Sequence, residues 1–212
     1  MRVARALVRL LAPDYCAACD APVPEGVVFC QECGGCLPPR GAVPLGACVA
    51  GEYAPPLSLA IRRFKFSQRA DLAWSLGRLL PWPSGLGSSG VWVVPVPLHR
   101  ARLVERGFNP AGLLARELSR RFGAHYAPRA LERLRDTPQQ ALLAAAERRS
   151  NMVGAFAPRD VGSARAAVLV DDVVTTGSTL EACRQALYAA GVVHVSVVAL
   201  AAAAAPERDG QV

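Results

Sequence analysis

The sequence lacks lysine almost entirely, and it has no long apolar run or signal-peptide start. Lys65 is the only lysine among the 24 basic residues of the 212-residue chain. The longest nearly apolar stretch, residues 192–205, is interrupted by His194 and Ser196 and falls short of the roughly 18 residues that suggest a membrane span. Arginines recur every three or four positions at the N-terminus, which excludes the apolar region of a signal peptide. We expect a soluble, cytoplasmic protein with no transmembrane segment.

The charge is basic, and arginine supplies nearly all of it. The formal net charge is +7. Because arginine forms bidentate bonds to phosphate, this balance fits a phosphorylated ligand or a nucleic acid as partner. A coding bias toward arginine and alanine explains it equally well. The charge alone therefore does not choose a function.

Cysteines are concentrated near the N-terminus. Six of the seven lie between residues 16 and 48, in a segment rich in Gly and Pro without a period that could build a core. An odd number without a secretion signal favours metal binding over a disulfide framework. Two Cys-x2-Cys pairs separated by ten residues are typical of two knuckles closing on one tetrahedral zinc. We predict a structural zinc held by four ligands: Cys16, Cys19, Cys30 and Cys33.

The other cysteines leave alternatives open. Cys36 follows Cys33 at the same spacing, so these two form another possible knuckle, and free or redox-active thiols are a further interpretation. Cys48 has no near partner, and Cys183 lies on the apolar side of an expected helix. We interpret Cys48 and Cys183 as packing residues, although Cys36 or Cys48 could replace one of the proposed ligands.

From Ala47 onward, apolar strands alternate with amphipathic helices, which predicts an α/β fold with a mostly parallel sheet flanked by helices. The expected strands are residues 91–96, 166–172 and 192–200, and the expected helices are residues 57–66, 70–80, 110–122, 138–149 and a segment ending near Gly191. Asn109 is expected to cap the 110–122 helix, and Gly123 to end it. We divide the chain into residues 1–48 (a helix over 2–12 and a zinc module), 49–205 (the α/β domain) and 206–212 (a flexible tail).

The most specific motif follows the expected strand 166–172. The strand ends in Asp171 and Asp172, and a hydroxyl-rich loop, Thr175–Thr179, then opens a helix. Ligands of parallel α/β sheets bind beyond the carboxyl ends of the strands, and a helix N-terminus attracts phosphate. Gly177 allows the backbone to approach the anion closely. A helix cap explains Thr and Asp here but does not require adjacent acids, so we expect a ribose 5-phosphate site.

This motif resembles the phosphoribosyl-diphosphate (PRPP) motif of type I phosphoribosyltransferases. Further segments resemble the ComF family, in which a four-cysteine zinc module precedes a phosphoribosyltransferase domain. They are residues 53–57, 65–66, 94–98, 106–109, 137–140 and 148–156. The resemblance covers about residues 13–200, and the family is associated with natural competence and DNA uptake.

The resemblance implies roles for individual residues. Asp171 and Asp172 would bind the 2- and 3-hydroxyls of the ribose. Leu98 and His99 would lie near the diphosphate, although His99 fits a capping role better than a catalytic one. The loop residues Thr175, Thr176, Gly177, Ser178 and Thr179 would hold the 5-phosphate. Residues 100–109 would form a mobile loop over the diphosphate. Within it, Arg106, with Arg102 behind it, would neutralise the negative charge of the departing diphosphate.

These residues suggest a Mg²⁺-dependent transfer of ribose 5-phosphate from PRPP to a nitrogenous acceptor, with release of diphosphate. The sequence identifies no general base, so the acceptor is open. Two alternatives lack catalysis: a PRPP sensor that binds single-stranded DNA, and an adaptor among other DNA-uptake proteins. The basic charge suits both of them, whereas the intact acidic pair and loop favour PRPP binding.

Overall fold

The computed structural model describes residues 14–35, 43–135 and 154–203. The predicted helices over residues 2–12 and 138–149, the predicted tail over 206–212 and the alternative ligand Cys36 lie outside these residues.

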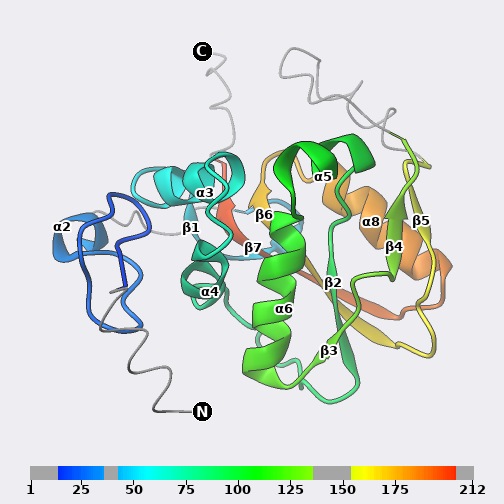
Figure 1. Ribbon diagram of the computed structural model, residues 1–212. Helices are drawn as coiled ribbons and strands as arrows, with labels where there is room; N and C mark the ends of the chain where they lie inside the picture. Colours follow the sequence, from blue (N-terminus) through cyan, green and yellow to red (C-terminus); the bar gives the residue numbers. More distant parts are fainter. Residues whose placement is uncertain (1–13, 36–42, 136–153, 204–212) are drawn as a thin grey trace, which may run out of the picture.

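The core of the fold is a five-stranded sheet in the order β1-β7-β6-β2-β3, and every neighbouring pair is parallel. The prediction of a mostly parallel sheet flanked by helices is therefore confirmed (Figure 1). The strands are β1 (Cys48–Glu52), β2 (Val91–Pro95), β3 (His125–Tyr126), β6 (Ala166–Val174) and β7 (His194–Ala202). The longest strands are almost continuously apolar because both faces of the sheet are covered. β6 lies between β7 and β2, so its carboxyl end is at the middle of one edge.

Helices cover the two faces of the sheet. On one face, α8 (Ser178–Ala189) places Leu180 and Leu187 in a core with Leu169 of β6. On the other face, α3 (Leu57–Phe66), α4 (Leu72–Gly77) and α6 (Pro110–Phe122) share a second core with Val168 and Val170. A two-stranded antiparallel ribbon, β4 (Leu131–Arg133) and β5 (Phe156–Pro158), packs on the α8 side.

Several element boundaries differ from the predictions. α4 ends at Gly77, not at residue 80. The next three N–H groups bond carbonyls three residues back, so the chain continues in a tighter turn as far as Leu80, where Pro81 disfavours helical backbone. β6 continues two residues past Asp172, and β7 begins and ends two residues later than expected. β1 was not predicted. Asn109 occupies the N-cap position of α6, but its side chain donates to the Val96 carbonyl oxygen (3.0 Å) instead of capping the helix.

The segment after β2 is helical where the family resemblance implied a mobile loop. Arg100–Arg106 form helix α5. The Nδ1 atom of His99 accepts a hydrogen bond from the Ala101 N–H (3.3 Å), which caps the start of the helix. Gly107 ends it with left-handed backbone (φ 79°), a conformation that glycine adopts without steric cost. His99 thus caps helix α5, in line with the capping role expected for it.

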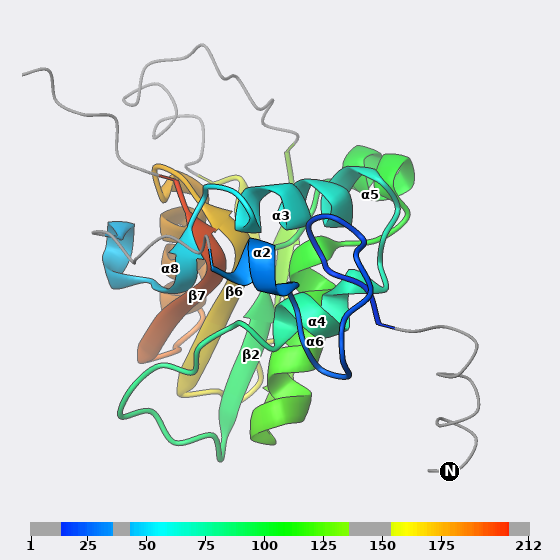
Figure 2. The same cartoon turned by 90° about the vertical axis from the view of Figure 1, so that its left-hand side faces the viewer.

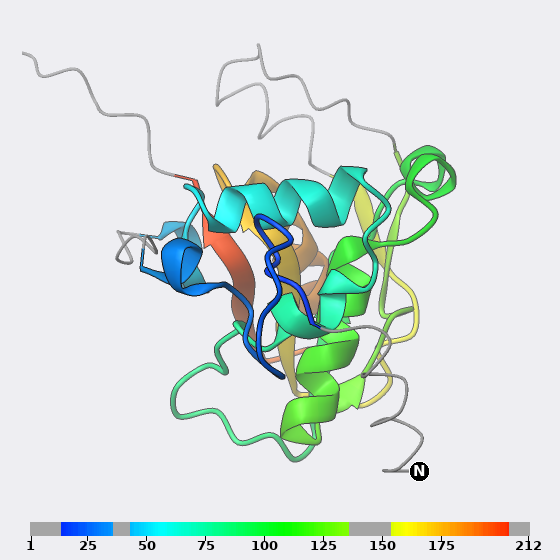
Figure 3. The same cartoon turned by 60° about the vertical axis from the view of Figure 1, so that its left-hand side comes forward.

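The N-terminal segment packs directly onto the sheet domain. It contains the short helix α2 (Gln31–Gly34), and the 3-10 turn η1 (Pro44–Gly46) precedes β1. Cys16, Ala17 and Phe29 belong to the same core as Leu57 and Phe64 of α3. Figures 2 and 3 show the segment lying against α3 and α4. Such shared burial ties the placement of the cysteine segment to that of α3.

Candidate functional site

The four predicted zinc ligands converge at one point. The Sγ atoms of Cys16, Cys19, Cys30 and Cys33 all lie within 4.8 Å of one another, and those of Cys19 and Cys30 are 3.7 Å apart. Zn–S bonds of about 2.3 Å in a tetrahedron place the sulfur atoms about 3.8 Å apart. The cluster therefore has the dimensions and the ligand chemistry to bind zinc.

The environment of these thiols also suits a cation. Burial would raise the pKa of Cys16, but backbone N–H groups of Cys30, Cys19 and Ala18 hydrogen-bond to its sulfur and lower the pKa to about 6. Burial and the neighbouring thiols raise the pKa of Cys33. One thiolate thus forms readily while the next resists ionisation. A divalent cation between them would remove that conflict because it neutralises the adjoining negative charge.

Of the two cysteines interpreted as packing residues, Cys183 is in the fold core and Cys48 packs against it. Cys48 begins β1, where it is partly buried against the core on the α3 side. Cys183 of α8 is fully buried, and this burial raises the pKa of its thiol well above the ordinary value.

The acidic pair lies near the carboxyl end of β6, and the two side chains face opposite sides of the sheet. Successive residues of a strand alternate between faces, so Asp171 follows Leu169 toward the α8 side and Asp172 follows Val170 toward the α3 side. The backbone N–H of Asp172 donates to Oδ1 of Asp171 (2.8 Å). The two carboxylates therefore flank the strand instead of forming one cluster.

Asp172 has a partner that the sequence did not reveal. Nζ of Lys65, near the C-terminal end of α3, donates to Oδ1 of Asp172 at 2.7 Å, and the two side chains are 17% and 11% exposed. The only signal in the sequence was that one lysine persists in a chain that otherwise uses arginine.

Asp171 is in an environment that opposes its ionisation. Burial, followed by the nearby charge of Asp172, raises its pKa to about 7, while Lys65 and Arg133 partly offset the rise. The carboxyl group consequently changes charge near neutral pH. A group with this property at a strand end is characteristic of binding and catalytic sites.

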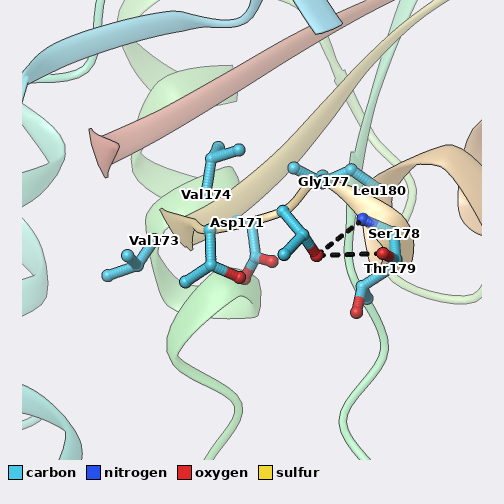
Figure 4. Close-up of a pocket in the computed structure, with 9 residues that line it drawn as sticks. Asp171, Val173, Val174, Gly177, Ser178, Thr179 and Leu180 are labelled. Atoms are coloured by element: carbon cyan, nitrogen blue, oxygen red, sulfur yellow. Dashed lines mark hydrogen bonds between the residues drawn. The ribbon is translucent and has the colours of Figure 1, made fainter. Parts of the chain in front are cut away.

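The hydroxyl-rich loop and Asp171 border a shared hollow (Figure 4). Its lining consists of Asp171 and residues 173–180. Oγ1 of Thr176 lies 2.9 Å from Oγ of Ser178 and accepts from the Ser178 N–H at 3.5 Å. α8 begins at Ser178, so its N-terminal N–H groups are at this hollow. The structure thus brings together one predicted acid and all five predicted loop residues.

Gly177 is required at this loop for two reasons. Its φ of 77° is unfavourable for other residues. A Cβ there would also lie 3.0 Å from Cδ1 of Leu45 in η1. The turn that precedes β1 therefore packs against the loop from outside the hollow.

The residues expected near the diphosphate are not among those that line the hollow. Leu98 and His99 follow β2, which is paired in parallel with β6, so they lie at the same edge as the acids. The Arg106 guanidinium lies over the Phe66 ring, 5.0 Å from its centroid, and Arg102 pairs with Glu105 (3.5 Å). Within the described part of the chain, neither arginine lines the hollow.

These features define a class of protein: a parallel α/β sheet with acids and a hydroxyl-rich helix N-terminus at its central strand, joined to a four-cysteine cluster. No protein-family model matches the chain. It is 35% identical over 200 residues to "DNA utilization protein YhgH" of Escherichia coli O157:H7, covering 86% of this chain and 87% of that protein.

Two further relatives match the chain over a similar length. The protein of the same name from Salmonella typhimurium is 34% identical over 200 residues, covering 86% of this chain and 87% of its own length. "Competence protein F" of Haemophilus influenzae is 33% identical over 205 residues, or 89% of this chain and 85% of that protein. The chain belongs to the ComF family of competence and DNA-utilization proteins. In the described residues, no helix has the length and apolar character needed to cross a membrane.

Proposed function

We propose that this protein binds PRPP together with Mg²⁺ and transfers its ribose 5-phosphate to a nitrogenous acceptor, releasing diphosphate, in support of DNA uptake or use in the cytoplasm. The observation that carries the proposal is the hollow at the end of β6, where Asp171 and the Thr175–Thr179 loop border the same space. A carboxylate beside a recess lined by hydroxyls matches a sugar phosphate, because the ligand has hydroxyls at one end and a phosphate at the other.

The 5-phosphate would bind at the start of α8. The hydroxyls of Thr175, Thr176, Ser178 and Thr179 offer donors, and the first N–H groups of α8 have no partner within the helix. The partial positive charge of the helix N-terminus favours the anion. Gly177 keeps a side chain out of this backbone turn.

The ribose hydroxyls would meet the acidic pair. Asp171 faces the hollow, and Asp172 is fixed on the other side of the strand by Lys65. Each carboxylate accepts a hydrogen bond from a hydroxyl, and bonds to charged acceptors are stronger than bonds to neutral ones. The pair would therefore set the position of the sugar relative to the loop.

The transfer itself would take place on the side of β2. The lone pair of the acceptor nitrogen forms the new bond to the anomeric carbon while the bond to the diphosphate oxygen breaks and its electrons leave with diphosphate; the proton of the acceptor N–H passes to water. Mg²⁺ would supply charge neutralisation on the diphosphate. Leu98 and His99 would approach the leaving group, and Arg106 and Arg102 would stabilise its growing negative charge after α5 shifts toward it.

The names of the relatives favour a second candidate. They describe competence and DNA utilization, and the net charge is +7. In this alternative the protein senses PRPP without turning it over and acts as an adaptor that binds single-stranded DNA or other DNA-uptake proteins. In both candidates, the four-cysteine cluster would hold a structural zinc that secures the N-terminal segment.

Calorimetric titration of PRPP with Mg²⁺ tests the shared part of both candidates. The double variant Asp171→Asn, Asp172→Asn changes the side-chain volumes little, and we expect its affinity to fall by at least about tenfold because two hydrogen bonds to charged groups are weakened. Asp160→Asn removes an exposed carboxylate elsewhere and serves as the matched control. Equal affinity in the double variant and the wild type would contradict the assignment of the acids.

Diphosphate release separates the two candidates. Wild-type protein is incubated with PRPP and Mg²⁺, with and without a panel of purine and pyrimidine bases. Release that depends on one acceptor supports the transferase. PRPP binding without release for any acceptor supports the sensor.

A further inference from the structure

Helix α3 contacts the cysteine segment on one side and the acidic pair on the other. Arg63 donates to the Ala18 carbonyl oxygen (2.9 Å) and forms an ion pair with Asp20. Two residues later, Lys65 donates to Asp172 (2.7 Å). Residues two apart on a helix point away from each other, so these contacts reach opposite neighbours. α3 therefore bridges the segment between Cys16 and Cys33 and the end of β6 (Figures 1 and 3).

The bridge is firmly held in the core. Leu57, Ile61 and Phe64 of α3 are at most 1% exposed, and they share their core with Cys16 and Ala17. Close-packed interiors deform little. A change in the position of the cysteine segment would thus be passed to α3 instead of being absorbed between them.

A second ion pair joins the cysteine segment to the chain around α3. Arg69, which follows α3, also pairs with Asp20 (3.1 Å). Asp20 directly follows the first cysteine pair of the cluster, and both arginines reach it. The same loop that brings Cys16 and Cys19 together consequently holds the chain on either side of Lys65.

The contact at the other end involves one carboxylate oxygen. Lys65 bonds Oδ1 of Asp172, and neither side chain is more than 17% exposed. Burial limits competition from water, so the bond restricts the rotation of the carboxylate. A hydroxyl needs a single oxygen as acceptor, so this bond and a bound sugar can coexist on Asp172.

We propose that Lys65 is a positioning residue that holds Asp172 for a ribose hydroxyl, and that α3 makes this placement depend on the four-cysteine segment. This inference rests on the proposed function and deepens it. Lys65 acts through Asp172, whereas Arg63 acts through α3. The zinc segment is then part of the sugar-binding machinery as well as an element of the fold.

The test is a double-mutant cycle on PRPP affinity, measured with Mg²⁺ on full-length protein. We expect Lys65→Met to weaken binding about tenfold and Lys65→Arg, which keeps the charge, to recover most of the loss. Because Lys65 acts only through Asp172, the combination of Lys65→Met with Asp172→Asn should bind no more weakly than Asp172→Asn alone. Arg62→Ala removes an exposed arginine of the same helix and should bind like the wild type.

Several outcomes would overturn the inference while leaving the proposed function intact. If Asp172→Asn weakens binding but Lys65→Met does not, Lys65 has no positioning role. Additive losses in the combined variant would mean that Lys65 contacts the ligand independently. Lys65→Leu also removes both the donor and the charge, and it replaces Lys65→Met if that variant fails to fold; wild-type affinity in Lys65→Leu also refutes the role. Absence of PRPP binding by the wild type would refute the proposed function itself.

The link to the cysteine segment is tested with Arg63→Ala. We expect it to weaken PRPP binding about threefold or more while zinc content stays at the wild-type level. Unchanged affinity in a folded Arg63→Ala protein would refute the coupling through α3.

Discussion

Replacing Asp171 by Asn should stabilise the protein at alkaline pH even though it weakens sugar binding. Burial and the charge of Asp172 raise the pKa of Asp171 from 3.8 to about 7. In the unfolded chain the carboxyl group has a pKa near 3.8. Between pH 3.8 and about 7, the folded protein therefore holds a proton that the unfolded chain has lost. Stability attributable to this group is therefore complete below the unfolded pKa and is lost as pH rises through the folded pKa.

The magnitude follows from the size of the shift. A difference of about three pKa units corresponds to roughly 4 kcal/mol. An amide at this position has no charge to desolvate, and its Oδ1 can still accept the 2.8 Å hydrogen bond from the Asp172 N–H. We therefore expect Asp171→Asn to raise the free energy of unfolding by up to about 4 kcal/mol at pH 8 and by less than about 2 kcal/mol at pH 5.

Urea unfolding at pH 5 and pH 8 measures this difference. Asp172→Asn is the contrasting variant, because it weakens the bond from Lys65 and should destabilise the protein by on the order of 1–3 kcal/mol. The reasoning is refuted if Asp171→Asn destabilises the protein at pH 8, or if its effect is the same at both pH values.

Three further predictions concern the cysteines and DNA. Metal analysis of the purified protein should give about one zinc per chain, and the double variant Cys19→Ser, Cys30→Ser should lose it because half of a tetrahedral site is removed. Cys36→Ser should retain the zinc and most of the stability; metal loss in that variant would show that Cys36 is a ligand. In filter-binding or fluorescence assays, single-stranded DNA should bind weakly, without sequence preference and with a steep decrease as salt rises. No binding at low salt would contradict a direct DNA contact.

The features that depend on local patterns can be read from the sequence alone. Two Cys-x2-Cys pairs identify a four-cysteine cluster that could bind zinc, because each tight turn presents two sulfur atoms to one point. Apolar runs and caps locate the main strands and helices, including α6 from Pro110 to Phe122. The succession of a strand, two acids and a hydroxyl-rich loop places the candidate site, since parallel strands present their carboxyl ends at a common edge.

The short elements α2, β1, α5, β3, β4 and β5 were not predicted, and β1 and α5 illustrate why their sequence signals are weak. β1 is short and follows a Gly- and Pro-containing turn, and its pairing with β7 is what makes it a strand. α5 depends on a side-chain cap from His99 and a left-handed residue at Gly107, and a charged, solvent-facing segment of this kind has little apolar period.

Contacts between distant residues depend on how the layers of the fold pack. Lys65 and Asp172 are separated by 107 positions, and their 2.7 Å contact exists because α3 packs on one face of the sheet at the end of β6. The packing of Leu45 in η1 against Gly177 also joins segments that are far apart in the sequence. Sequence patterns repeat over a few residues, whereas such contacts depend on how packed layers bring remote segments together. The raised pKa of Asp171 likewise follows from burial and neighbouring charge in the folded protein, because desolvation is a property of the packed site and not of the residue alone.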